Sequence, residues 1–477
     1  ITAGDEAGAL YAVQTMRQLL PDDAWRAASP PGSVNWELPC ADVEDRPALA
    51  WRGAHLDVAR HFVPKRELLV LIDALAALKL NRLHLHLTDD QGWRIESRLH
   101  PALHEIGSHR LRSQISLNSE QPRVYDDIPH GGYYPLDDLA EIAAYAGERG
   151  MALVPEIDLP GHSTALLAAL PEHGSGPPPD GGYRVSPDWG IFDNLVAPLP
   201  ATMAVVRDVL GEVITATGAR YVHIGGDECV LDRWRHDARI EAARRDRGLA
   251  TTEELHAAFL QDIAVVLAAD FAVRAVVWDE CFADRGGATL RPDTVVMAWR
   301  GMQVARAAAE AGHDVIAAPV LPTYFDYAQD SGDTEPVAIG GPVRLADVAG
   351  FEPVPDDWPQ ATRDRLIGTQ FQVWTEYIAD GRALEYMIFP RACALADVAW
   401  SGRPSPLSAD SPHRSGLLPR IATHLRRLDA AGLEYRPLTG PRPWQQAGTG
   451  PRRHRAGYPV KDVAVRLRQL AAAGAGS

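Results

Sequence analysis

The chain has 477 residues, of which 46% are hydrophobic and 23% charged, a composition typical of a globular protein with a large core. The length fits two to four domains, or one α/β barrel with appendages. The net charge of −16 argues against a nucleic-acid or anionic-membrane partner, because a phosphate-binding surface needs clustered cations. A neutral partner such as a sugar is compatible with this charge.

The cysteines and the chain ends give further limits. Cys40, Cys229, Cys281 and Cys393 form no Cys-x-x-Cys pair, so we expect buried free thiols and neither a zinc site nor a disulfide framework. No segment approaches the roughly 18 consecutive apolar residues of a membrane span, and we expect no membrane partner. The chain begins Ile1-Thr-Ala-Gly-Asp, without Met or a signal-peptide pattern. The N-terminus therefore looks trimmed, and neither a cytoplasmic nor a secreted location is predicted.

The first 45 residues contain one helical pattern, over residues 8–20, followed by a polar, Pro-rich stretch. A single short helix cannot bury its apolar face alone. We interpret residues 1–45 as the end of a truncated N-terminal α+β domain.

Short apolar runs alternate with amphipathic patterns from residue 46 to residue 402. This alternation predicts a (β/α)₈ barrel of the α/β class. A doubly wound sheet is the alternative, but it normally has fewer strands and a Gly-rich phosphate motif at its first strand, and no G-x-G-x-x-G occurs there. The expected strands are 55–58, 82–87, 152–155, 221–224, 275–278, 295–299, 314–317 and 368–374. The expected helices include 65–78, 136–149, 203–217 and 252–269.

Three long interruptions and a tail complete the organisation. Residues 101–134, 164–198 and 323–361 are rich in Gly, Pro and Asp and follow the second, third and seventh strands. We therefore expect them to wall the end of the barrel where the strands finish. Residues 403–477 are expected to form a C-terminal extension packed on the barrel, with one or two short helices and a final helix over 460–472.

Two adjacent carboxylates, Asp227 and Glu228, end the segment Tyr221-Val-His-Ile-Gly-Gly-Asp-Glu. The apolar run reads as a strand, and barrel enzymes keep their chemistry at the C-terminal ends of strands. Two ionised carboxylates side by side repel, so each needs a neighbour or a proton. On spacing alone a capped turn is an equally good interpretation, because Asp after Gly-Gly often begins a helix.

Polar and aromatic side chains follow most of the other predicted strands. Such a set suits a pyranose, whose hydroxyls take charged hydrogen bonds and whose C–H faces pack on aromatic rings. In strand order they are Asp57, Arg60 and His61; Asp89, Asp90, Trp93 and Arg94; Glu156, Asp158 and His162; Trp278, Asp279 and Glu280; Trp299 and Arg300; and Trp374, Glu376 and Tyr377.

Four motifs make a specific resemblance. Leu56-Asp-Val-Ala-Arg-His-Phe, His84-Leu-His-Leu-Thr-Asp-Asp-Gln-Gly-Trp-Arg, Pro155-Glu-Ile-Asp-Leu-Pro-Gly-His and His223-Ile-Gly-Gly-Asp-Glu occur in this order. They resemble motifs of the family 20 glycoside hydrolases, the exo-acting β-N-acetylhexosaminidases, over about residues 46 to 400. The opening helix resembles the end of the α+β domain that precedes the barrel in that family. We expect no cofactor and no metal.

The resemblance implies a retaining, substrate-assisted mechanism, an exception to two-carboxylate glycosidase chemistry. The 2-acetamido oxygen of the substrate attacks the anomeric carbon and forms an oxazolinium intermediate. Glu228 protonates the leaving oxygen and then activates water, and Asp227 orients the acetamido N–H. Tyr324 hydrogen-bonds the acetamido carbonyl. An ionised Asp227 is expected to raise the pKa of Glu228.

The resemblance also assigns substrate-binding residues. Arg60 is expected to grip the 3- and 4-hydroxyls with its fork of donors. Asp89 and His162 orient the acid, and Glu156 and Asp158 support them by hydrogen bonds. The remaining implied residues are Trp278 and Trp299 as walls of the acetamido pocket, Trp374 beneath the ring, Asp326 near an outer hydroxyl and Glu376 near the 4- and 6-hydroxyls.

One departure and two alternatives remain. A tryptophan expected shortly after the Tyr324-Phe-Asp326 segment is replaced by Ala338-Ile-Gly-Gly-Pro, which changes one aromatic wall. The His84-x-His86 pair also suggests a metal-dependent amidohydrolase barrel, although the later strands do not supply its further histidine ligands. A catalytically inactive sugar-binding barrel is the second alternative. The expected partner is an oligosaccharide or glycoconjugate ending in β-linked N-acetylglucosamine or N-acetylgalactosamine, and neither this choice nor the oligomeric state is predicted.

Overall fold

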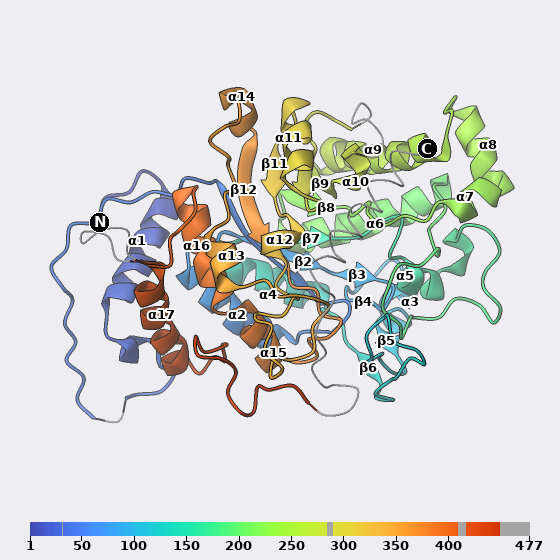
Figure 1. The fold of residues 1–477 in the computed structure, drawn as a ribbon. Coiled ribbons are helices and arrows are strands. Elements are labelled where there is room, and N and C mark those ends of the chain that lie inside the picture. The colour runs from blue at the N-terminus through green and yellow to red at the C-terminus, as the bar shows by residue number, and fades with distance from the viewer. Residues whose placement is uncertain (31, 284–289, 409–415, 449–477) are drawn as a thin grey trace.

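The computed structural model describes residues 1–30, 32–283, 290–408 and 416–448. Eight parallel strands close a barrel in the order β1-β2-β7-β8-β9-β10-β11-β12, which confirms the predicted fold class (Figure 1). All eight predicted strands are present, although the first begins at Trp51 and the last ends at Phe371. They are β1 (Trp51–Asp57), β2 (Arg82–His86), β7 (Ala152–Glu156), β8 (Tyr221–His223), β9 (Arg274–Trp278), β10 (Val295–Ala298), β11 (Val315–Ala317) and β12 (Leu366–Phe371).

Amphipathic helices surround the barrel and include all four that the sequence pattern predicts. In α2 (Lys65–Ala77) the buried residues Leu68, Leu71, Ile72 and Leu75 follow the spacing of one helical face. The other long helices are α4 (Leu136–Gly147), α6 (Pro200–Thr217), α9 (Thr252–Phe271), α11 (Met302–Glu310), α15 (Gly381–Ile388) and α16 (Arg391–Ser401). Other helices outside the barrel are α7 (Asp232–His236), α8 (Ala238–Asp246), α10 (Glu280–Ala283) and α14 (Gln360–Arg363).

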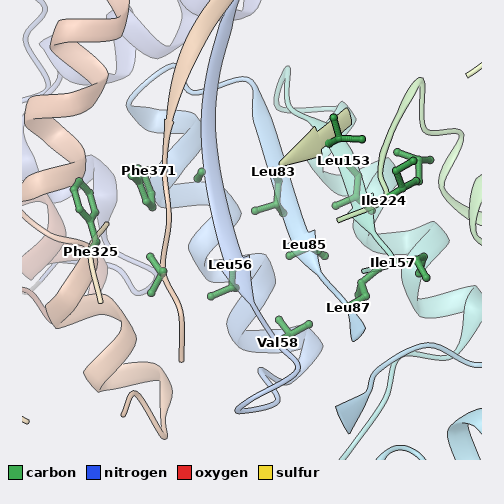
Figure 2. Packing of buried hydrophobic residues seen from close by; sticks show 14 of the residues in the cluster. Leu56, Val58, Leu83, Leu85, Leu87, Leu153, Ile157, Ile224, Phe325 and Phe371 are labelled. Atoms are coloured by element: carbon green, nitrogen blue, oxygen red, sulfur yellow. The ribbon is translucent and has the colours of Figure 1, made fainter. Parts of the chain in front are cut away.

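Successive side chains of each strand point to opposite faces of the barrel wall. Leu56, Leu83, Leu85 and Leu153 face outward into the main core between strands and helices (Figure 2). Alternate residues therefore face the barrel interior, and they include His84, His86 and His223.

The interior of the barrel is apolar on one side and polar on the other. Val276, Met297 and Ile316, from β9, β10 and β11, pack there with Trp51 and Trp278. On the opposite strands the inward positions are filled by a polar group whose register places His55 beside His84, and Glu156 beside both His86 and His223. These side chains form the floor beneath the C-terminal ends of the strands.

The long insertions after the second and third strands pack on one another at one side of the barrel mouth (Figure 1). The first contains two small antiparallel sheets, and the second begins with a short helix. The elements are β3 (Thr88–Asp89), β4 (Gly92–Trp93), α3 (Ala102–Glu105), β5 (His109–Arg110), β6 (His130–Gly131), α5 (Thr164–Ala169) and η2 (Pro171–His173). After β11 come α12 (Val320–Thr323) and α13 (Leu345–Ala349).

The first and last described helices meet on the outside of the barrel. Helix α1 (Glu6–Leu19) is tied to the C-terminus of α2 by a hydrogen bond from Gln18 to the carbonyl of Ala77 (2.7 Å). Helix α17 (Leu417–Ala431) packs on η1 (Asp22–Trp25) and on α16, and Arg427 donates to the carbonyl of Gln18. The predicted helix over 460–472 lies outside the described residues.

The four cysteines are free, as predicted, but only Cys281 and Cys393 are buried. Cys229 is half-buried, and Cys40 is exposed because the stretch after η1 has no regular structure. Within the described part of the chain, no helix has both the length and the apolar character that crossing a membrane requires.

Candidate active site

Two glycines form the turn that places Asp227 and Glu228 at the mouth of the barrel. Gly225 and Gly226 have φ values of 65° and 98°. A Cβ on Gly225 would lie 1.6 Å from Oδ1 of Asp158, so only glycine fits this turn. The helix that follows begins at Asp232 with Leu231 as its N-cap. The interpretation of Asp227 as a helix cap is therefore wrong, because the chain makes a loop of several residues before the helix begins.

His162 lies between the carboxylate pair and the end of β2. Its Nε2 is 3.6 Å from Oε2 of Glu228 and 4.0 Å from Oδ2 of Asp227. Its Nδ1 is 3.3 Å from carboxylate oxygens of both Asp89 and Asp90. Burial alone would lower the pKa of His162, but these carboxylates raise it well above its usual range. The imidazole is thus held as a cation among acids.

His162 and Glu228 both have left-handed backbones, with φ of 48° and 49°. Such conformations are uncommon for residues other than glycine and persist where the surrounding structure enforces them. Both members of the contact are therefore held in place by the fold around them.

Asp227 has a buried carboxylate oxygen that is free to accept. Its Oδ1 has no hydrogen-bond partner among the described residues. Burial raises the pKa of Asp227 well above its ordinary value, and the neighbouring carboxylates of Asp158 and Glu228 raise it further. Burial also raises the pKa of Asp158 to about 7. The repulsion expected between the adjacent carboxylates thus raises the pKa of Asp227. The raised pKa expected for Glu228 stays a prediction.

Arg60 follows β1 and is held by three side chains. Its guanidinium contacts Asp89 (2.8 Å), Asp57 (3.3 Å) and Gln91 (2.9 Å). Asp57 also accepts from the backbone N–H of Arg60 and from the backbone N–H of Thr375, beyond β12. This carboxylate therefore joins the loop after the first strand to the loop after the last.

Four aromatic rings line the site in two contacting pairs. Trp278 and Trp374 have centroids 6.0 Å apart, and Trp299 and Tyr324 have centroids 6.4 Å apart. The guanidinium carbon of Arg60 lies 5.1 Å from the Trp374 ring, which links the second half of the site to the first. Trp299 and Trp374 follow β10 and β12 rather than lying within them, so their rings stand at the rim.

Asp326 and Glu376 are two further acids on this side. Oδ1 of Asp326 is buried and has no partner within the described residues. Burial raises the pKa of Asp326 well above its usual value, and Glu376 adds to the shift. Burial likewise raises the pKa of Glu376, against the opposing effect of Arg60. The structure thus brings all eleven predicted site residues to one end of the barrel.

The segment Ala338-Ile-Gly-Gly-Pro leaves space for a tyrosine. A Cβ on Gly340 would lie 2.7 Å from Cε1 of Tyr327. The Tyr327 ring packs on the small cluster of Val320 and Tyr324, which Trp299 and Trp374 also contact. Tyr327 therefore contributes an aromatic group that sequence reasoning missed. Its position three residues after Tyr324 was the available signal.

Other site residues were quoted in motifs without a role. Asp57 and Gln91 hold Arg60, and Glu280 accepts from the indole N–H of Trp299 (2.8 Å). His86 contacts Asp89 (2.8 Å) from the barrel interior. Each stands two or three residues from a predicted site residue, but only the fold shows which side chain it contacts.

Several buried acid and histidine groups are close enough together to share a metal ion. Among the described residues these are His55, His84 and Glu156; His86, Glu156 and Asp158; Asp89, Asp90 and His162; and Asp158, His162 and Asp227. Three of the four include Glu156 or Asp89, whose oxygens already lie at hydrogen-bond distance from imidazole or guanidinium nitrogens. Such oxygens serve as hydrogen-bond acceptors in this arrangement.

Fold and site together define a (β/α)₈ barrel whose strand ends present acids, arginine and a cluster of aromatic rings, a set of side chains that suits a polar, ring-shaped ligand. Residues 49–403 match the model of glycosyl hydrolase family 20, catalytic domain, and the chain belongs to this family. This membership places it among glycoside hydrolases rather than metal-dependent amidohydrolases.

Individual proteins similar to this chain are consistent with the family assignment. A β-hexosaminidase of Porphyromonas gingivalis is 34% identical over 90% of this chain, and one of Vibrio furnissii is 35% identical over 83%. The matches cover 52% and 62% of those proteins, so the chain spans little more than half of their length. The crystal structure of a family 20 exo-β-N-acetylglucosaminidase from Vibrio harveyi, in complex with N-acetylglucosamine, is 31% identical with a TM-score of 0.76. The match covers 91% of this chain and 65% of that one.

Proposed function

We propose that this protein is an exo-acting, retaining β-N-acetylhexosaminidase that removes terminal β-linked N-acetylglucosamine or N-acetylgalactosamine by substrate-assisted catalysis. The observation that carries the proposal is the arrangement of two adjacent carboxylates. One contacts a buried histidine, and the other presents a buried oxygen that has no partner in the described part of the chain. Family membership and the Vibrio harveyi complex with N-acetylglucosamine support the same substrate class.

The two carboxylates divide the work. Glu228, next to the His162 imidazole, protonates the glycosidic oxygen as the bond breaks and later takes a proton from water. The 2-acetamido oxygen attacks the anomeric carbon, so the nucleophile belongs to the substrate. Oδ1 of Asp227 accepts the acetamido N–H, whose acidity grows as positive charge develops on the ring that forms. The acetamido N–H stabilises the ionised carboxylate of Asp227, because it replaces a hydrogen bond from water that burial has removed.

The remaining side chains hold the sugar. Trp278, Trp299 and Tyr324 enclose the acetamido group, and Trp374 supports the face of the pyranose, since aromatic rings pack on C–H faces. Arg60 donates to the 3- and 4-hydroxyls, and Asp326 and Glu376 accept from outer hydroxyls.

We also propose a division of the chain. Residues 46–402 form the catalytic barrel, residues 1–45 the end of a preceding α+β domain, and residues 403–477 an extension packed on the barrel. The natural partner is then an oligosaccharide or glycoconjugate with a terminal β-N-acetylhexosamine.

The test compares two aryl glycosides that differ only at C2. We expect the 4-nitrophenyl 2-acetamido-2-deoxy-β-glucoside to be cleaved and the plain β-glucoside to be almost untouched, because only the first carries the nucleophile. Similar rates on both would contradict the mechanism. Binding of N-acetylglucosamine without any cleavage would instead support an inactive sugar-binding barrel.

A further inference from the structure

Glu156, at the end of β7, lies inside the barrel directly below the proposed active site. Its side chain is fully buried. Oε1 lies 2.8 Å from Nδ1 of His223 and accepts from the indole N–H of Trp278 (2.9 Å). Oε2 lies 2.7 Å from Nδ1 of His86 and 3.0 Å from Nε2 of His84. One carboxylate thus gathers four nitrogen groups, two on each oxygen.

His86 connects Glu156 to the proposed acid. Its second nitrogen, Nε2, lies 2.8 Å from Oδ2 of Asp89. Since both ring nitrogens face carboxylate oxygens, both must carry protons, and His86 is an imidazolium. Asp89 then contacts His162, and His162 contacts Glu228. Acids and histidines alternate without a gap from the barrel floor to the proposed acid.

We propose that Glu156 is a positioning residue for both halves of the reaction, acting through His86 and Asp89 on the acid Glu228 and through Trp278 on the acetamido pocket. The inference rests on the proposed function. It goes beyond that function because it assigns a role to Glu156, which lies on the barrel floor and acts through other side chains. Its two oxygens divide the roles, Oε1 holding the indole of Trp278 and Oε2 holding His86.

Loss of the His86 cation should raise the pKa of His162 and lower the pKa of Glu228. The cations of His86 and Arg60 together offset the charge of Asp89. When the His86 cation is lost, more of the Asp89 charge acts on His162, and the pKa of His162 rises. A more persistent His162 cation favours ionised Glu228, which therefore loses its proton at lower pH.

The other charged groups around these two histidines act on His162 in the same direction. Glu156 raises the pKa of Asp158 and of Asp227, so its loss leaves more ionised carboxylate beside His162. His162 also faces Asp90 at 3.3 Å and Asp227 at 4.0 Å, and it lowers the pKa of buried Asp158. His86 also faces the rings of His55 on β1 and Trp374 after β12. Burial and the neighbouring histidines keep the pKa of His55 well below its usual value, so it adds no charge.

The test compares Glu156→Gln, His86→Gln and a control. Glutamine at position 156 keeps the shape, but it loses the negative charge and one of the two acceptor oxygens that bind His86 and Trp278. We expect the basic limb of its kcat/KM pH profile to move down by about one unit, and KM for the 2-acetamido substrate to rise severalfold. His86→Gln keeps a donor near Asp89 without the charge, so it should reproduce the pH shift with little change in KM.

The matched control is Glu335→Gln. Glu335 is a buried carboxylate outside the barrel mouth, where it accepts from the hydroxyl of Tyr386 and contacts Arg436. This variant should lose thermal stability but keep the wild-type pH profile and KM. If Glu156→Gln behaves like this control, Glu156 is only a structural residue and the proposal is wrong. If Glu156→Gln does not fold, an unshifted pH profile for His86→Gln would contradict the proposal.

A second readout does not depend on turnover. NMR titration of isotopically labelled histidine, with the His162 signal assigned by its loss in His162→Gln, gives the pKa of His162 directly. We expect this pKa to rise in Glu156→Gln and in His86→Gln. An inactive wild-type enzyme would overturn the proposed function, whereas an unchanged His162 pKa would overturn the connection to Glu156.

Discussion

The guanidinium of Arg60 lies 2.8 Å from the carboxylate of Asp89, whose other oxygen contacts His162. The proposed sugar-binding arginine and the proposed acid machinery therefore share one buried carboxylate. A change at Arg60 should therefore alter the protonation of Glu228 through Asp89 and His162.

Replacing Asp227 with asparagine should reduce kcat on the 2-acetamido substrate by about 10²–10³-fold. The amide removes the negative charge that stabilises the developing oxazolinium. Steady-state kinetics and thermal unfolding check this, and the fold should stay intact because Oδ1 of Asp227 has no partner among the described residues. Asp326→Asn is the matched control, since Oδ1 of Asp326 is also buried and has no partner within the described ranges. The effect of this variant should fall on KM. Full activity in Asp227→Asn would remove Asp227 from the mechanism.

Replacing Glu228 with glutamine should lower turnover of a disaccharide by about 10²–10⁴-fold, the usual contribution of a general acid. The loss should be smaller on a 4-nitrophenyl glycoside, because nitrophenolate leaves without a proton. Comparing kcat/KM on the two substrates checks this. In Glu376→Gln, by contrast, kcat/KM should fall by the same factor on both substrates. The same loss on both substrates in Glu228→Gln would show that Glu228 is not the acid.

Replacing Arg60 with lysine should raise KM at least about tenfold, because one ammonium cannot replace the fork that contacts Asp89, Asp57 and Gln91. The basic limb of the pH profile should also move down, since Asp89 loses part of its compensation. Arg52→Lys is the control. Arg52 is buried at the opposite end of β1 and donates to backbone carbonyls, so its replacement should affect stability alone.

The buried Asp158 should make stability depend on pH. Burial raises its pKa to about 7 in the folded protein, above the value of about 3.9 for an unfolded chain. The folded state therefore binds the proton more tightly, and this contribution is full below pH 4 and lost as pH rises towards 7.

Asp158→Asn removes that titration while keeping an acceptor for the N–H of Gly226. Relative to the wild type, the variant should gain about 2 kcal/mol of unfolding free energy between pH 5 and pH 7.5. Urea unfolding at both pH values measures it. An equal difference at the two pH values would mean that Asp158 titrates normally.

Much of the fold was predictable because its signals are local. Helix α2 follows a 3.6-residue period, and β2 alternates outward leucines with inward histidines. The motifs named the site residues because a barrel gathers all strand ends at one face. Errors arose where a strand ends irregularly: Trp299 and Trp374 were placed inside strands, but they follow them.

The partners of the site residues were not predictable, because they lie far apart along the chain. Asp57 binds the backbone of Thr375, 318 positions away, and Glu156 binds His86 70 positions away. On spacing alone Asp227 had two equally good interpretations. The family resemblance favoured the catalytic one, and the position of α7 excluded the cap. The sequence by itself determined the barrel, the family resemblance and the residues at the strand ends, since periodicity and motif order are properties of the chain. Only the tertiary structure decided which acid meets which histidine, because closing the barrel brings strands from both halves of the chain around one buried floor.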